Sequence, residues 1–400
     1  MGRGATAGLY GLAWGSLAVV VMVSCVAPKA APSWPSGIEA GPAKLEDAHA
    51  AEGGADGSSD VTTDAGGDVH AASVDPFGLE PGLRGERVRV QTTAWGRSAV
   101  NVGPGFDPER PTLAIVYATP NGNTLEETLG RRRADGEAFR YDIQHVLAQT
   151  RLLRSAMPDT NVVLAVVEEK RLSWPTWVKH EGRPTARSVL AEPIAFLPSA
   201  SVVWASHSGG GSLVLAAIQE APIPSEVTTV AFLDSHYAFE EGSGHGRRLA
   251  VWLRANEAHR LVAIAYDDRR IRLHGRPVVS KKGGSFRATD RLRDALRHEG
   301  FPLSHDHVGP FDRYLAAGGR VDLRVHPNRE NRILHSALVS DENGFAFAVA
   351  LGRGARAEAA ARFGRPRLFA AYEDDAPPAS TPSGDAGALP SESVSASPAP

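Results

Sequence analysis

Cysteine is almost absent from this chain, which holds a single one, Cys25, among 400 residues. A lone thiol cannot form an internal disulfide, and it cannot build a zinc site of several cysteines. Basic runs are also lacking, and the formal net charge is -3. These features argue against a nucleic-acid partner. Hydrophobic residues make up 42% of the chain, which is enough to form the core of one large domain or two small ones.

The start of the chain has no apolar run of full membrane-spanning length. Arg3 precedes an apolar stretch over residues 9–23, which has the size of a signal-peptide core. The stretch ends in M-V-S-C at residues 22–25 and resembles the bacterial lipobox, whose cysteine is lipidated. We therefore expect residues 1–25 to be a lipoprotein-type signal segment and the protein to be exported and anchored to a bacterial membrane through Cys25. The alternative is a plain secretory signal, or an uncleaved anchor, with an incidental cysteine.

Large apolar residues are scarce in two further regions, residues 26–73 and 373–400. Such sequences cannot bury enough surface to offset the entropy cost of ordering, so we predict a disordered linker and a disordered tail. Residues 74–372 between them are predicted to form one globular domain.

Short apolar runs alternate with amphipathic segments through residues 74–372. The apolar runs predict strands at 87–95, 112–118, 161–167, 201–205, 227–233, 261–266 and 321–325. The amphipathic segments predict helices at 143–157, 186–196, 212–219, 247–256, 290–298 and 344–351. Strands that are apolar on both faces belong in a parallel sheet covered by helices, which predicts a doubly wound α/β fold. Reactive side chains then gather at the carboxyl ends of the strands.

One strand end carries a catalytic pattern. The predicted strand 201–205 leads into S-H-S-G-G-G at residues 206–211, and a helix follows. This is the small-x-Ser-x-Gly form of a nucleophile elbow, in which Ser208 would occupy a strained turn between small neighbours. The helix N-terminus would direct backbone N–H groups at a developing negative charge. The alternative is a glycine-rich turn that binds phosphate or only packs.

The order of elements, this turn and a late histidine resemble the α/β-hydrolase superfamily over most of residues 74–372. The resemblance implies an eight-stranded, mostly parallel sheet with helices on both faces. It also implies a catalytic triad in the chain order serine, acid, histidine. It does not imply a substrate.

The resemblance places an oxyanion loop at residues 118–124, where the sequence reads A-T-P-N-G-N-T. Asn121-Gly122 stands where the family usually has His-Gly, but a backbone donor requires no particular side chain. We predict that the N–H groups of Gly209 and Asn123 form the oxyanion hole. A simple Asn-Gly turn is the alternative.

The base and the acid of the triad each have two candidates. We favour His335 as the base, because the family carries this histidine on a loop, whereas His326 ends a strand. A structural role for His335 in a local hydrogen bond is the alternative. We favour Asp234 as the acid, because Asp267 lies in a charge cluster beside two arginines and would be poorly placed to orient an imidazole. Family position favours Asp267, which remains the alternative acid.

Two further motifs have plainer interpretations. The H-D-H of residues 305–307 offers two metal-type ligands without an evident third and fourth, so we interpret it as a polar loop and expect no metal. Trp174 and Trp177 either line a pocket or pack in the core.

The predicted function is hydrolysis of an ester, thioester or amide by an exported serine hydrolase. Ser208 would attack the carbonyl, His335 would transfer the proton, and an aspartate would orient the imidazole. Such chemistry needs no cofactor, and the partners would be a small-molecule or acyl substrate and the membrane. The second hypothesis is a catalytically silent α/β-hydrolase fold that serves as a binding or scaffold lipoprotein of the envelope.

Overall fold

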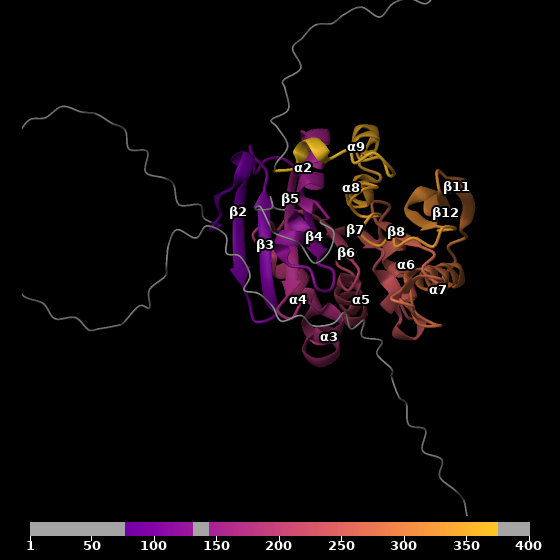
Figure 1. Ribbon diagram of the computed structural model, residues 1–400. Helices are drawn as coiled ribbons and strands as arrows, with labels where there is room; N and C mark the ends of the chain where they lie inside the picture. The colour runs from indigo at the N-terminus through magenta and orange to yellow at the C-terminus, as the bar shows by residue number, and fades with distance from the viewer. Residues whose placement is uncertain (1–76, 131–143, 375–400) are drawn as a thin grey trace, which may run out of the picture. The chain divides into compact units, whose positions relative to one another are not determined.

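A computed structural model describes residues 77–130 and 144–374 of the chain (Figure 1). The predicted signal segment with Cys25, the predicted linker and nearly all of the predicted tail lie outside these residues. Among the described helices, none combines the length and the apolar character needed to cross a membrane.

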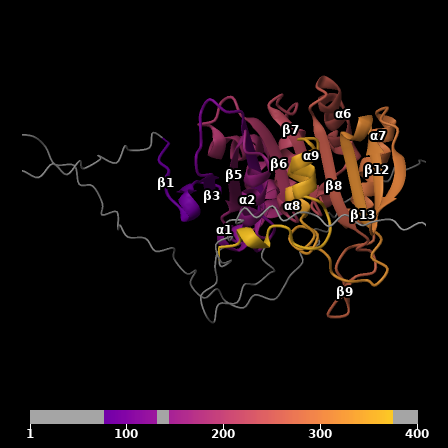
Figure 2. The ribbon, with the colours of Figure 1, turned by 90° about the horizontal axis from the view of Figure 1, so that it is seen from above.

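The described domain is built on an eleven-stranded mixed sheet (Figure 2). Its strands, in spatial order, are β1 (Glu80–Pro81), β2 (Arg87–Thr92), β3 (Gly96–Val102), β5 (Asn161–Glu169), β4 (Thr112–Ala118), β6 (Ser201–His207), β7 (Val227–Leu233), β8 (Arg260–Tyr266), β13 (Val321–His326), β12 (Phe311–Ala316) and β11 (Ser304–Val308). The strands from β5 to β13 pair in parallel, and those at both edges pair antiparallel. Two short strands, β9 (Arg272–Leu273) and β10 (Arg276–Pro277), form a separate hairpin.

Helices cover both faces of the sheet (Figure 1). One face carries α3 (Trp174–Trp177), α4 (Ala186–Ala191), α5 (Gly210–Glu220), α6 (His245–Ala255) and α7 (Ser285–His298). The other carries α1 (Leu125–Leu129), α2 (Val146–Ala156), α8 (Gly344–Ala350) and α9 (Ala355–Ala360). The predicted α/β class with helices on both faces is confirmed. The expectation of eight strands is wrong, because short and polar edge strands extend the parallel centre.

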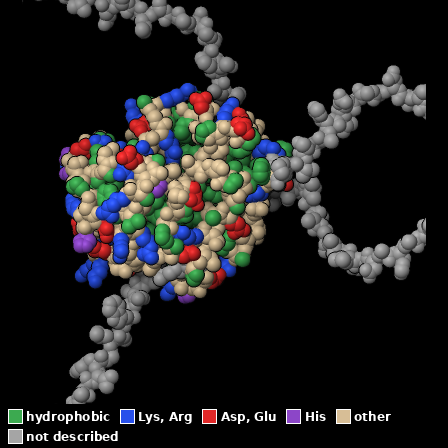
Figure 3. Space-filling model, turned by 180° about the vertical axis from the view of Figure 1, so that it is seen from behind, with side chains coloured by type: hydrophobic (Ala, Val, Ile, Leu, Met, Phe, Trp, Pro, Cys, Tyr) green, Lys and Arg blue, Asp and Glu red, His purple; other side chains and the backbone are tan. Residues whose placement is uncertain are grey.

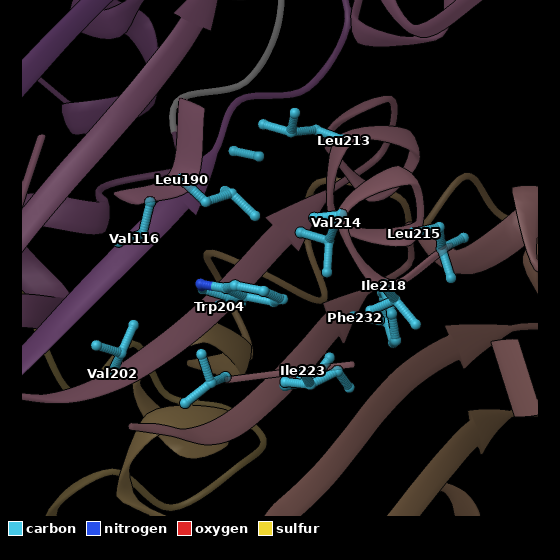
Figure 4. Close-up of a cluster of buried hydrophobic side chains, with 14 of the residues drawn as sticks. Val116, Leu190, Val202, Trp204, Leu213, Val214, Leu215, Ile218, Ile223 and Phe232 are labelled. Atoms are coloured by element: carbon cyan, nitrogen blue, oxygen red, sulfur yellow. The ribbon is translucent and has the colours of Figure 1, made fainter. Parts of the chain in front are cut away.

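The central strand β6 shows why these residues fold this way. Successive side chains of a strand point to opposite faces. Val202 and Trp204 pack in the cluster with α5 (Figure 4), whereas Val203 and Ala205 pack in the cluster on the other face. Burying a large apolar side chain stabilises the fold by roughly 1.5–3 kcal/mol. A strand that is buried on both faces is thereby fixed in register, and so is the turn that follows it.

The fold decides two local interpretations and adds one strand that the sequence did not predict. Trp174 and Trp177 are buried and belong to the core cluster that contains α5, so they pack rather than line a pocket. The H-D-H segment, interpreted as a polar loop, is instead part of β11, an edge strand that pairs with β12. Its exposed polar side chains give no sequence signal for a strand. The strand β3 was not predicted because its buried sequence, G-R-S-A-V-N-V, mixes polar and apolar residues.

The surface carries charges of both signs. On the face shown in Figure 3, Lys and Arg side chains are interspersed with Asp and Glu. This distribution is that of an ordinary solvated surface.

Candidate active site

The turn between β6 and α5 holds Ser208 in a strained conformation. Ser208 has φ 51°, a left-handed value that costs a residue with a side chain of the order of 1–3 kcal/mol. The surroundings force close approach, because a Cβ atom added at Gly211 would lie 1.8 Å from the carbonyl oxygen of Ser235. The Oγ atoms of Ser206 and Ser235 are 2.9 Å apart and tie the end of β6 to the loop after β7. Strand, strained turn and helix thus follow one another in the order that a nucleophile elbow requires.

Asp234 and His335 meet beside this turn. Asp234 follows β7 directly, has φ 47°, and its side chain is 4% exposed. The Nδ1 atom of His335 donates to Asp234 Oδ2 over 2.5 Å. A carboxylate at Nδ1 favours the tautomer that carries its proton there and leaves Nε2 as a proton acceptor. The two residues are 101 positions apart in the sequence, so the contact is a product of the fold.

The segment that carries His335 is anchored from two sides. The side chain of Asn328 donates to the carbonyl oxygens of Asp267 and Arg332 at 3.0 and 2.9 Å. The side chain of Gln149, on α2, donates to the carbonyl oxygen of Val339 at 2.9 Å. Both anchoring side chains are buried. The loop position of His335 is therefore set by hydrogen bonds within the domain.

His207 connects this segment to the turn. Its Nε2 atom donates to the carbonyl oxygen of His335 over 3.1 Å, and the two imidazole rings lie 4.3 Å apart. Burial lowers the pKa of His207 well below its usual value, so its ring is neutral near pH 7. His207 immediately precedes Ser208, and the structure thus brings Ser208, His335 and Asp234 to one place.

The hydroxyl of Ser208 is hydrogen-bonded to the hydroxyl of Tyr237, with the oxygen atoms 3.2 Å apart. Tyr237 lies in the short 3-10 helix His236–Ala238, just after Asp234. Burial raises the pKa of Tyr237 above its usual value, so the phenol remains neutral and can donate. The structure therefore joins Tyr237 to the serine.

Asp267 and His326, the alternative acid and base, form hydrogen bonds with other partners. Both carboxylate oxygens of Asp267 accept from the guanidinium of Arg269, at 2.8 and 2.7 Å. These hydrogen bonds lower the pKa of Asp267. The Nδ1 atom of His326 accepts from the backbone N–H of Asn328 at 2.9 Å. The structure therefore brings Asp234 and His335 together, and it pairs Asp267 and His326 with near neighbours in sequence.

The predicted oxyanion donors are placed differently from each other. Gly209 follows Ser208 directly, as a donor should. The N–H of Asn123 is used within its own loop, where it donates to the carbonyl oxygen of Pro120 at 3.4 Å. The loop residue next to the turn is Asn121, since a Cβ atom at Gly209 would lie 1.8 Å from its Oδ1 atom. In the described part of the chain, that buried Oδ1 has no hydrogen-bond partner. The Nδ2 group of the same Asn121 amide, which can donate, also lies against Gly209.

A second carboxyl group, that of Asp268, lies close enough to Asp234 to be influenced by its charge. Asp268 is buried and accepts from the backbone N–H of Ser285, at the start of α7, over 2.8 Å. Burial, and next the charge of Asp234, raise the pKa of Asp268 to about 7. The sequence grouped this residue with the solvated charges around Asp267. Only its burial distinguishes it, and no local pattern reveals that.

Two cavities on the described surface lie away from this site. One, of about 280 Å³, is lined by residues that include Phe77, Val102 and Phe196. The other, of about 410 Å³, is lined by residues that include Leu113 and Arg356. Neither is lined by the serine, the histidine or the aspartate of the site. The site contacts solvent at the His335 side chain, which is 32% exposed.

No protein-family model matches the chain, and no curated protein sequence does. Among solved structures, it is similar to an uncharacterised protein from Capnocytophaga ochracea, at 14% identity and a TM-score of 0.39 over 66% of this chain and 63% of that one. A feruloyl esterase module from Clostridium thermocellum gives 11% identity and a TM-score of 0.36 over 66% and 88% of the two chains. A siderophore hydrolase from Aspergillus nidulans gives 12% identity and a TM-score of 0.32 over 72% of this chain and 97% of that one.

Proposed function

We propose that the chain is a serine hydrolase that cleaves an ester, thioester or amide of a small-molecule or acyl substrate. The observation that carries the proposal is the 2.5 Å contact between His335 Nδ1 and Asp234 Oδ2 beside the strained turn of Ser208. A serine on the turn after β6, an aspartate directly after β7 and a histidine on the loop after β13 supply the nucleophile, the orienting acid and the base that acyl transfer requires.

The chemistry proceeds in two acyl transfers. The Oγ atom of Ser208 attacks the substrate carbonyl while Nε2 of His335 takes its proton. The bond to the leaving group then breaks, and the proton passes from His335 to that group. Water, deprotonated by the same imidazole, cleaves the acyl-enzyme and restores the serine. Asp234 stabilises the imidazolium in both steps, and no cofactor is required.

The negative charge of the tetrahedral intermediate needs donors near the turn. The backbone N–H of Gly209, just after the nucleophile, is one. The side-chain amide of Asn121, which lies against Gly209, is the second donor that we assign. Losing one such donor in other hydrolases lowers turnover by about 10²–10³.

We also propose that the protein is exported and held at a membrane of the bacterial cell envelope by a lipid on Cys25. The support is the sequence alone: an apolar run of signal-peptide size ends at the one cysteine of the chain.

A silent member of the fold, acting as a binding or scaffold module, is the competing function. The observation that favours it is the hydrogen bond of the Ser208 hydroxyl to Tyr237 rather than to an imidazole. Catalytic hydrogen bonds, however, are often long or misaligned in the absence of substrate. The two functions differ in whether the serine reacts.

Hydrolysis of a p-nitrophenyl ester series, from acetate to octanoate, separates them. The wild-type chain should release p-nitrophenol, and Ser208→Ala should lose that activity by several orders of magnitude, as triad knockouts do. Ser225→Ala is the matched control, because Ser225 is exposed on the loop before β7, and it should keep wild-type activity. Activity of Ser208→Ala above about a tenth of wild type would exclude the proposed nucleophile.

A further inference from the structure

A cluster of metal-type ligands lies at the edge of the sheet, on the hairpin of β11 and β12 (Figure 1). His305 and His307 are two residues apart on β11, so their side chains leave the same face of the strand. Asp312, on β12, pairs directly with His307. One ligand atom from each of the three residues lies within 4.8 Å of the others. The register therefore supplies the third ligand that the H-D-H sequence lacked.

Two imidazole nitrogens converge on a single carboxylate oxygen. Asp312 Oδ1 lies 3.2 Å from Nε2 of His305 and 2.9 Å from Nδ1 of His307. Two imidazole nitrogens and a carboxylate oxygen form a ligand set that suits Zn²⁺ and other borderline divalent ions. Ligand distances of about 2.0–2.2 Å require only small side-chain rotations from this arrangement.

Neighbouring groups hold the ligands in place. The ring of His305 stacks on Tyr314, with centroids 4.7 Å apart and an angle of 15° between the planes. The guanidinium of Arg293, from α7, lies over the same tyrosine ring at 3.7 Å. Asp306 and Arg313 pair with each other on the opposite face of the hairpin. The face of the histidines therefore holds the three ligands, the tyrosine and the guanidinium of Arg293.

The site is open to solvent. The histidine side chains are 46% and 74% exposed, and that of Asp312 is 28% exposed. An ion can therefore enter without any opening of the fold. Three protein ligands leave a fourth position for water.

We propose that His305, His307 and Asp312 bind one divalent transition-metal ion, with Zn²⁺ as the expected occupant, independently of the hydrolase site. The ion bridges β11 to β12 and stabilises the outermost strand of the sheet. Because the ion binds only where both strands are paired, it adds to the stability of the folded state.

Calorimetric titration of the full chain with ZnCl₂, after removal of metals with a chelator, tests the proposal. We expect a site of one ion per chain, whose affinity falls at least about tenfold in His307→Ala and in Asp312→Asn. Removing even an outer-shell partner of a metal ligand typically costs 10–100-fold in affinity. His298→Ala is the matched control, because this exposed histidine ends α7, and its Zn²⁺ affinity should equal that of the wild type.

The isosteric variant and two further measurements complete the test. Asp312→Asn retains the shape of the side chain, so the test survives if His307→Ala folds poorly. Ser208→Ala should bind Zn²⁺ as tightly as the wild type, which separates this site from the proposed hydrolase function. Zn²⁺ should also raise the Tm of the wild type and leave that of Asp312→Asn unchanged. Equal Zn²⁺ affinity in the wild type, His307→Ala and Asp312→Asn, or no binding to the wild type, would overturn the proposal.

Discussion

Two aspartates at neighbouring strand ends show how one residue type acquires different roles. Asp234 is sheltered and contacts an imidazole, whereas Asp267 is paired with Arg269. The sequence could separate them, because the arginines beside Asp267 are visible in it. It could not show that Tyr237 contacts the serine or that Asp268 is buried near the acid, since both features depend on packing between distant segments.

At this scale the role of the acid can be measured. Asp234→Asn preserves the shape of the side chain but removes the charge that stabilises the imidazolium, and it should lower kcat for p-nitrophenyl ester hydrolysis by about 10⁴, as the same change does in a serine protease. Asp267→Asn is the control and should lower it much less. A large loss in Asp267→Asn with little loss in Asp234→Asn would reverse the assignment.

At the scale of elements, the strand β6, its turn and α5 form the unit that positions Ser208. Strand β4 appears in the structure at the predicted residues 112–118 and β7 at 227–233, because long apolar runs in a parallel sheet are unambiguous. Helix ends moved by several residues; α7, predicted from residue 290, begins at Ser285. The hairpin of β11 and β12 was not predicted, because its exposed polar side chains do not show the alternation of apolar and polar residues that marks a strand.

The close packing of this unit predicts a sensitive glycine. Gly211→Ala would place a Cβ atom 1.8 Å from the carbonyl oxygen of Ser235, so the backbone must shift. We expect a loss of about 1–3 kcal/mol in the free energy of unfolding and a loss of esterase activity, measured by urea denaturation and by turnover. Gly242→Ala is the control, because its Cβ atom would meet no atom within 4 Å. Equal stability of the two variants would contradict this account of the turn.

At the scale of the whole molecule, the buried Asp268 links stability to pH. Its pKa is raised to about 7 in the folded state, from an ordinary value of 3.8. The folded state therefore binds more protons than the unfolded state between these values, and stability falls as pH rises through that window. Asp268→Asn removes the ionisable group and with it this loss of stability at high pH.

Urea denaturation at pH 4.5 and pH 8 measures the effect. Relative to wild type, Asp268→Asn should gain about 2–4 kcal/mol between the two conditions. The exposed Asp294→Asn serves as the control and should gain nothing. If the stability difference between Asp268→Asn and the wild type is the same at both pH values, the carboxyl group of Asp268 titrates normally and this account is wrong.

The proposed anchor also belongs to this scale. Cys25→Ala in the full-length chain expressed in bacteria should move the protein from the membrane fraction to the soluble fraction, because the acyl chains hold it there. Detergent phase partitioning and metabolic labelling with a fatty-acid analogue measure this. Cys25→Ser, which also lacks the thiol, should behave as Cys25→Ala does. Unchanged partitioning of both variants would contradict the lipid anchor.

The central claim is that Ser208 is a reactive nucleophile, and covalent labelling with a fluorophosphonate probe tests it most directly. The phosphonate traps an activated serine without requiring knowledge of the substrate, and peptide mass spectrometry locates the adduct. We predict a single adduct on Ser208 that is abolished in Ser208→Ala and strongly slowed in Asp234→Asn. A wild-type chain that stays unlabelled, or an adduct that persists in Ser208→Ala, would contradict the account.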